Sequence, residues 1–185
     1  MKKFTHVFFD LDGTLTNPAM GITNSVEYAL NKFGIQVENK EDLFKFIGPP
    51  LNNSFIEFYG FDKEQAIEAV RIYREYFSSK GIYENEVYDD IVEILTSLKK
   101  ADKKIVLATS KPQKFAIEIL HHFKLYDLFD LIFGASMDEK LCEKEDIIRC
   151  ALKEIPKDSN AIMVGDRKFD IIGAKFNNIK SKNLT

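Results

Sequence analysis

Two aspartates, Asp10 and Asp12, are the residues best suited to chemistry, and they lie in the segment His6-Val-Phe-Phe-Asp-Leu-Asp-Gly-Thr-Leu-Thr16. The apolar run 7–9 predicts a buried strand, and Gly13 then allows the chain to turn sharply. Open α/β sheets hold their ligands at the carboxyl ends of such strands. A calcium-binding EF-hand loop is a poorer interpretation, because it places a third ligand before its glycine and lies between helices.

Three later segments carry polar groups in comparable places. Thr109 and Ser110 follow the expected strand 104–108, and Gly165-Asp166 follows the expected strand 161–164. A further carboxylate, Asp170, comes four residues after Asp166. A charged stretch between them contains Lys140 and Lys144. Each segment alone has an ordinary explanation as a helix cap, a turn or a solvated loop. Together they predict that hydroxyls, carboxylates and a lysine meet at one edge of a sheet.

Hydrophobic periodicity predicts the elements that position these groups. Residues 18–81 are almost continuously helical in pattern, as in Ile22, Val26, Leu30 and Phe33, and contain a Gly48-Pro49-Pro50 loop. From residue 91 onward, expected strands alternate with expected helices, which indicates a parallel sheet. The predicted fold class is therefore α/β: a Rossmann-like parallel sheet formed by residues 1–16 and 82–185, with an all-helical cap, residues 17–81, inserted after the first strand.

Composition narrows the class of protein. The chain has 185 residues, a net charge of −3, 45% apolar residues and 30% charged residues, which is typical of a globular domain. This net negative charge does not indicate a surface that binds a nucleic-acid polymer or an anionic membrane. No apolar run approaches the ~20 residues that cross a bilayer. We expect a cytoplasmic protein that is a monomer or weak dimer. The sixteen Phe and seven Tyr fall mostly on helical stripes, which favours core packing over base stacking.

The segments FDLDGTLT and VGDRKFD, with ATSKP between them, resemble the motifs of the haloacid dehalogenase-like hydrolase superfamily. Within it, the stretch GITNSVEYAL, the IGPPL loop and VGDRKFDIIGAK are similar to the phosphoglycolate phosphatase group, and its bacterial 5′-nucleotidase-like branch most of all. The resemblance implies a Mg²⁺-dependent phosphatase that hydrolyses a small phosphate monoester of the 5′-nucleotide or phosphoglycolate type. It therefore implies a small phosphorylated metabolite as the partner. A pyrophosphatase or sugar phosphomutase of the same superfamily, or a non-catalytic binding protein, are the alternatives.

The resemblance also implies a role for each polar residue. Asp10 would be the nucleophile that forms an aspartyl-phosphate, and Asp12 the general acid and base. Thr109 would donate a hydrogen bond to a phosphoryl oxygen. Lys144 would neutralise phosphate charge, with Lys140 as the second choice for this lysine. Asp10, the backbone carbonyl of Asp12, and Asp166 would hold Mg²⁺.

The remaining candidate residues are expected to lie around the reacting phosphate. We expect Asp170 to hold metal-bound waters or the lysine. Gly13, Thr14 and Ser110 are expected to contribute to substrate binding, and Gly48 and Pro49 to face the leaving group. The resemblance runs out near residue 179, where members of the superfamily continue into a further strand and helix, so we expect the final edge strand of the sheet to be missing.

Overall fold

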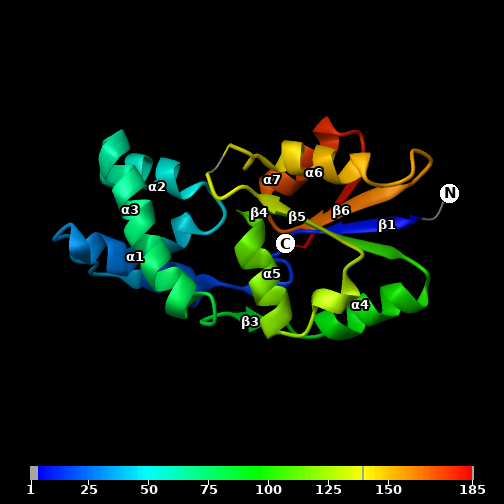
Figure 1. Ribbon diagram of the computed structural model, residues 1–185, viewed down its shortest axis with the longest axis horizontal. Coiled ribbons are helices and arrows are strands. Elements are labelled where there is room, and N and C mark those ends of the chain that lie inside the picture. Colours follow the sequence, from blue (N-terminus) through cyan, green and yellow to red (C-terminus); the bar gives the residue numbers. More distant parts are fainter. Residues whose placement is uncertain (1–3, 139, 185) are drawn as a thin grey trace. The chain divides into compact units, whose positions relative to one another are not determined.

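A computed structural model describes residues 4–138 and 140–184 of the chain (Figure 1). The chain forms two compact units: unit 1 contains the residues up to Thr16 and from Val87 onward, and unit 2 is Asn17–Glu86. The two short strands β2 (Thr16–Asn17) and β3 (Glu86–Val87) form a separate two-stranded sheet at the two crossings.

Unit 1 is built on a five-stranded sheet in the order β5-β4-β1-β6-β7. Every neighbouring pair is parallel. The strands are β1 (His6–Phe9), β4 (Lys104–Pro112), β5 (Leu131–Ala135), β6 (Ala161–Gly165) and β7 (Lys180–Asn183). The sheet confirms the predicted α/β fold with a parallel core.

The central strand β1 is buried along its whole length, which explains its continuous apolar sequence. Phe9 pairs in register with Leu107 of β4 and with Val164 of β6. Strands β1 and β6 therefore end nearly level, at Phe9 and Gly165, and β4 continues past them to Pro112. We call this end of β1, β4 and β6 the carboxyl edge of the sheet.

Helices cover both faces of the sheet in unit 1: α6 and α7 lie over one face, and α4 and α5 over the other (Figure 1). On the first face, Phe8 and Val106 pack against Ile147, Ile148 and further buried apolar side chains. These helices are α4 (Ile91–Lys100), α5 (Gln113–His122), α6 (Lys144–Lys153) and α7 (Lys168–Phe176), and a short 3-10 helix, η3, spans Tyr126–Leu128. The layered packing fixes the strand ends on which the polar residues lie.

The expectation that the final edge strand is missing was wrong. Residues Lys180–Asn183 form β7, which pairs with β6 from Ile162↔Lys180 to Gly165↔Asn183. All four residues are exposed, so the strand needs no apolar pattern and gives no hydrophobic signal in the sequence. Its stability comes from backbone hydrogen bonds to β6, and lysines at such an edge oppose pairing with other chains.

Unit 2 is helical, as the periodicity predicts. Its elements are α1 (Ala19–Lys32), the 3-10 helix η1 (Lys40–Phe46), α2 (Leu51–Tyr59), α3 (Lys63–Tyr76) and a π-helical turn η2 (Phe77–Gly81). Aromatic rings fill its interior: Phe46 packs against Phe55, Phe58 and Tyr59. This confirms that the aromatic residues of these stripes serve core packing. Within residues 4–138 and 140–184, no helix has the length and apolar character that crossing a bilayer requires.

Candidate active site

Asp10 lies at the centre of the carboxyl edge, directly after β1. Its backbone N–H donates to the carbonyl of Val164 on β6, at 3.0 Å. The residue is only 7% exposed, yet its carboxylate is not isolated, because Lys144 Nζ lies 2.7 Å from Asp10 Oδ1. A buried carboxylate of this kind requires a cationic partner.

Lys144 supplies that charge from the first residue of α6. Its ammonium also lies 2.9 Å from Asp170 Oδ1 and donates to the carbonyl of Ala108 at 3.1 Å. Burial lowers the pKa of Lys144, but the charges of Asp10 and Asp170 outweigh burial and hold the pKa above its ordinary value. Lys140, the second choice for this role, has a side chain that is 85% exposed and pairs with Asp138.

Asp170, on α7, is 1% exposed and is the second carboxylate that contacts Lys144. Burial, with the nearby charge of Asp10, raises the pKa of Asp170 to about 6. Its Oδ2 accepts a hydrogen bond from the backbone N–H of Arg167 at 3.1 Å. A Cβ on Gly165 would lie 2.2 Å from Asp170 Cγ, so the end of β6 needs glycine for this carboxylate to fit.

Asp166 meets the turn that follows β1. Its two carboxylate oxygens accept hydrogen bonds from Thr14 Oγ1 and from Arg167 Nε, each at 3.1 Å. Gly13 has a φ of +86°, and a Cβ there would lie 2.4 Å from Asp166 Oδ2. Glycine is thus required both for the turn and for the close approach of this carboxylate.

The carboxyl edge contains a donor set that suits Mg²⁺. Among the described residues, Asp10, Asp166 and Asp170 each offer a carboxylate oxygen, and these oxygens lie within 4.8 Å of one another. Mg²⁺ prefers hard oxygen ligands and takes few carboxylates. Lys144 balances part of the charge of Asp10 and Asp170, which leaves Asp166 as the carboxylate of the three that does not pair with this lysine. The residues therefore fit a divalent cation.

Asp12 pairs with Lys111, a residue for which the sequence motifs predict no role. Lys111 Nζ lies 2.6 Å from Asp12 Oδ2, and the two side chains are 5% and 14% exposed. Burial raises the pKa of Asp12, and the charge of Lys111 opposes that rise. Lys111 follows Thr109 by two residues, so an extended strand places both on one side. That spacing is the signal that would have identified it.

Thr109 and Ser110 lie near the end of β4. Thr109 is 1% exposed, and its Oγ1 accepts a hydrogen bond from the backbone N–H of Lys111 at 3.2 Å. The pairing of β4 with β5 shifts register between Thr109 and Pro112. Ser110 is half-buried. The irregular strand end thus brings a hydroxyl of Thr109 and the ammonium of Lys111 to the same edge as Asp10 and Asp12.

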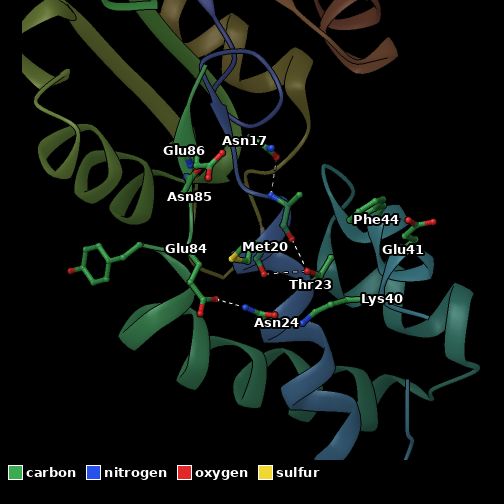
Figure 2. Close-up of a pocket in the computed structure, with 12 residues that line it drawn as sticks. Asn17, Met20, Thr23, Asn24, Lys40, Glu41, Phe44, Glu84, Asn85 and Glu86 are labelled. Atoms are coloured by element: carbon green, nitrogen blue, oxygen red, sulfur yellow. Dashed lines mark hydrogen bonds between the residues drawn. The ribbon is translucent and has the colours of Figure 1, made fainter. Parts of the chain in front are cut away.

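Unit 2 contains a pocket of about 690 Å³ (Figure 2). Amide, carboxylate and apolar groups share its lining, and Asn24 Nδ2 donates to Glu84 Oε2 at 2.7 Å. The lining residues are Asn17, Ala19, Met20, Thr23, Asn24, Lys40, Glu41, Phe44, Tyr83, Glu84, Asn85 and Glu86. Gly48, with a φ of +103°, and Pro49 lie in the loop between η1 and α2 and do not line this pocket.

Comparisons with known proteins identify relatives over nearly the whole chain. A family model described as haloacid dehalogenase-like hydrolase matches residues 7–183. A 5′-nucleotidase of Pseudomonas aeruginosa is 43% identical over 96% of this chain and 80% of its own length. The tyrosine-protein kinase PtkA of Mycobacterium tuberculosis is 38% identical over 91% of this chain, which spans 57% of that protein. The crystal structure of a predicted phosphatase from Clostridium acetobutylicum has a TM-score of 0.93 and 53% identity, covering 98% of this chain and 85% of that chain.

Proposed function

Since this chain belongs to the haloacid dehalogenase-like hydrolase family, we propose that it hydrolyses a small phosphate monoester. In the proposed reaction an aspartyl-phosphate forms on Asp10, with Mg²⁺ as cofactor. It is a phosphatase of that family. The observation that carries the proposal is the buried contact of Asp10 with Lys144, at 2.7 Å. A phosphate dianion next to a carboxylate needs a cation within reach, and this lysine supplies one.

The proposed reaction begins with attack of Asp10 on phosphorus. The Asp12 carboxylic acid gives its proton to the leaving oxygen as the bond between that oxygen and phosphorus breaks. Asp12, now a carboxylate, takes a proton from the water that attacks the aspartyl-phosphate and releases phosphate. The raised pKa of Asp12 supports the first role, because it favours the protonated form that donates.

Asp10, Asp166 and the backbone carbonyl of Asp12 would hold the Mg²⁺. When bound, the ion would neutralise charge on the phosphoryl oxygens. Thr109 would donate a hydrogen bond from its hydroxyl to a phosphoryl oxygen. Asp170 would keep Lys144 in place, which its 2.9 Å contact with the lysine supports.

The proposed substrate is a 5′-nucleotide, with phosphoglycolate as the second choice. The similarity to a 5′-nucleotidase at 43% identity supports the nucleotide. The pocket of unit 2 supports it as well, because amides such as Asn24 and an aromatic ring such as Phe44 are groups that bind a nucleobase. We propose that unit 2 selects the substrate, with Gly48 and Pro49 contributing to that choice.

A substrate panel tests this proposal. The purified protein is assayed with p-nitrophenyl phosphate, nucleoside 5′-monophosphates, phosphoglycolate, pyrophosphate and glucose 1-phosphate, each with Mg²⁺ or with EDTA. We expect Mg²⁺-dependent release of phosphate, with the highest kcat/KM for a nucleotide. Preference for pyrophosphate, or conversion of the sugar phosphate without release of phosphate, would assign the protein to another activity of the family. No turnover of any ester would favour a binding protein.

A further inference from the structure

The ion pair between Lys111 and Asp12 has no place in the reaction as described so far. Lys111 Nζ lies 2.6 Å from Asp12 Oδ2, and both side chains are largely buried. Lys111 lies at the end of β4, and Asp12 lies in the turn that follows the neighbouring parallel strand β1. The contact therefore joins two segments that continue from paired strands, and both side chains are shielded from solvent.

Stability alone gives a weak reason for this pair. Burying two charges costs desolvation energy that their attraction roughly offsets, so buried ion pairs add little net stability compared with apolar groups of similar volume. A role in orientation explains the pair better. Lys111 contacts Oδ2 of Asp12, whereas Oδ1 is buried and has no hydrogen-bond partner among the described residues. The lysine thus fixes the rotation of the carboxyl group and leaves one oxygen available.

The same segment also fixes Thr109. The backbone N–H of Lys111 donates to Thr109 Oγ1 at 3.2 Å. One irregular strand end therefore connects a hydroxyl expected to bind phosphate with the carboxyl group expected to move protons. Proton transfer depends strongly on such placement, because an error of about 1 Å can cost on the order of 10²-fold in rate.

We propose that Lys111 is a positioning residue that holds Asp12 for proton transfer to the leaving oxygen. The inference rests on the proposed function, because it needs Asp12 to act as the general acid. In that step the proton passes from Asp12 to the ester oxygen, the bond from that oxygen to phosphorus breaks, and the bond from Asp10 to phosphorus forms. An alkoxide needs this proton far more than p-nitrophenolate does, so the effect of Lys111 depends on the leaving group.

The test compares kcat/KM for a nucleoside 5′-monophosphate and for p-nitrophenyl phosphate, because kcat/KM reports the steps up to transfer of the phosphoryl group. For Lys111→Met we expect a fall of about 10²-fold with the nucleotide and a several-fold smaller fall with p-nitrophenyl phosphate. Lys111→Arg should recover part of the loss, because it keeps a cation beside Asp12. Lys114→Met, an exposed lysine three residues away on α5, should leave both values unchanged.

A second comparison separates action through Asp12 from direct contact with phosphate. In an Asp12→Asn background, Lys111→Met should cause little further loss with either ester. Equal losses with both esters in the single variant, or a full further loss in the Asp12→Asn background, would overturn the assignment. If Lys111→Met does not fold, Lys111→Gln, which keeps a hydrogen-bond donor, serves for the same comparisons. Absence of turnover in the wild-type protein would instead contradict the proposed function itself.

Discussion

Replacement of Lys144 by methionine is the perturbation whose consequences the structure defines most closely. Lys144 Nζ lies 2.7 Å from Asp10 Oδ1 and 2.9 Å from Asp170 Oδ1, and its side chain is 3% exposed. Methionine fills a similar volume without the charge. The variant therefore leaves two buried carboxylates next to each other without their shared cation.

The expected loss of stability follows from that arrangement. Removal of one partner from a buried ion pair costs about 3–5 kcal/mol, because an uncompensated charge remains in a site with little water. The loss should depend on pH. Burial raises the pKa of Asp170 to about 6 although Lys144 lowers it, so removal of the lysine raises this pKa further. At pH 5 a proton therefore neutralises this carboxylate in place of the lysine. We therefore expect the full loss of about 3–5 kcal/mol at pH 8 and a clearly smaller loss at pH 5.

Urea unfolding followed by circular dichroism measures these differences, in EDTA and again in millimolar Mg²⁺. Addition of Mg²⁺ should recover part of the loss if the carboxylates bind the ion. Adding Asp170→Asn to Lys144→Met should recover part as well, because one of the two facing charges is removed. Lys140→Met is the matched control and should unfold like the wild type, since that side chain is 85% exposed. A Lys144→Met protein with wild-type stability at pH 8 would refute this account of the buried charges.

Three further outcomes are expected at the same edge of the sheet. Gly13→Ala should lower kcat/KM at least about tenfold, because the new Cβ would lie 2.4 Å from Asp166 Oδ2; unchanged kinetics would show that the turn can move freely. Asp166→Ala should raise the Mg²⁺ concentration for half-maximal activity at least about tenfold, and a Mg²⁺ titration that overlays the wild type would exclude this carboxylate as a ligand. In EDTA, the protonated Asp170 stabilises the fold fully below its ordinary pKa of 3.8, and this contribution is lost as the pH rises through about 6. Asp170→Asn should remove about 3 kcal/mol of that pH dependence, measured by urea unfolding between pH 4 and 7, and an unaltered pH profile would count against a raised pKa.

The sequence predicts most of the fold because burial imposes regular patterns. The alternation of strands and helices after residue 91 predicts the parallel sheet, and the helical stripes from Ile22 onward predict unit 2. The strand Lys180–Asn183 escaped prediction because its four residues are all exposed. Such a strand depends on backbone pairing with β6, and this leaves no trace in the pattern of apolar residues.

The candidate site, like the fold, could be predicted only in part from the sequence. Asp10, Asp12, Thr109 and Asp166 could be selected because polar residues directly after apolar strands meet at one edge of a parallel sheet. The partner of each side chain could not be predicted in this way. Whether Lys140 or Lys144 reaches Asp10 depends on where α6 begins, and Lys111 appeared as an ordinary residue before Pro112. Its spacing from Thr109 marks Lys111 as a candidate for the same edge, but only the structure shows that its ammonium meets Asp12.

The proposed function requires that Asp10 carry the phosphoryl group during turnover. The most direct measurement is acid quenching of the protein during turnover of p-nitrophenyl phosphate with Mg²⁺, followed by borohydride reduction and mass spectrometry of the peptide that contains Asp10. Reduction of an aspartyl-phosphate converts the aspartate to homoserine. We expect this conversion at Asp10, and only in the presence of both substrate and Mg²⁺. Conversion of a different aspartate, or rapid turnover by an Asp10→Asn variant, would contradict it.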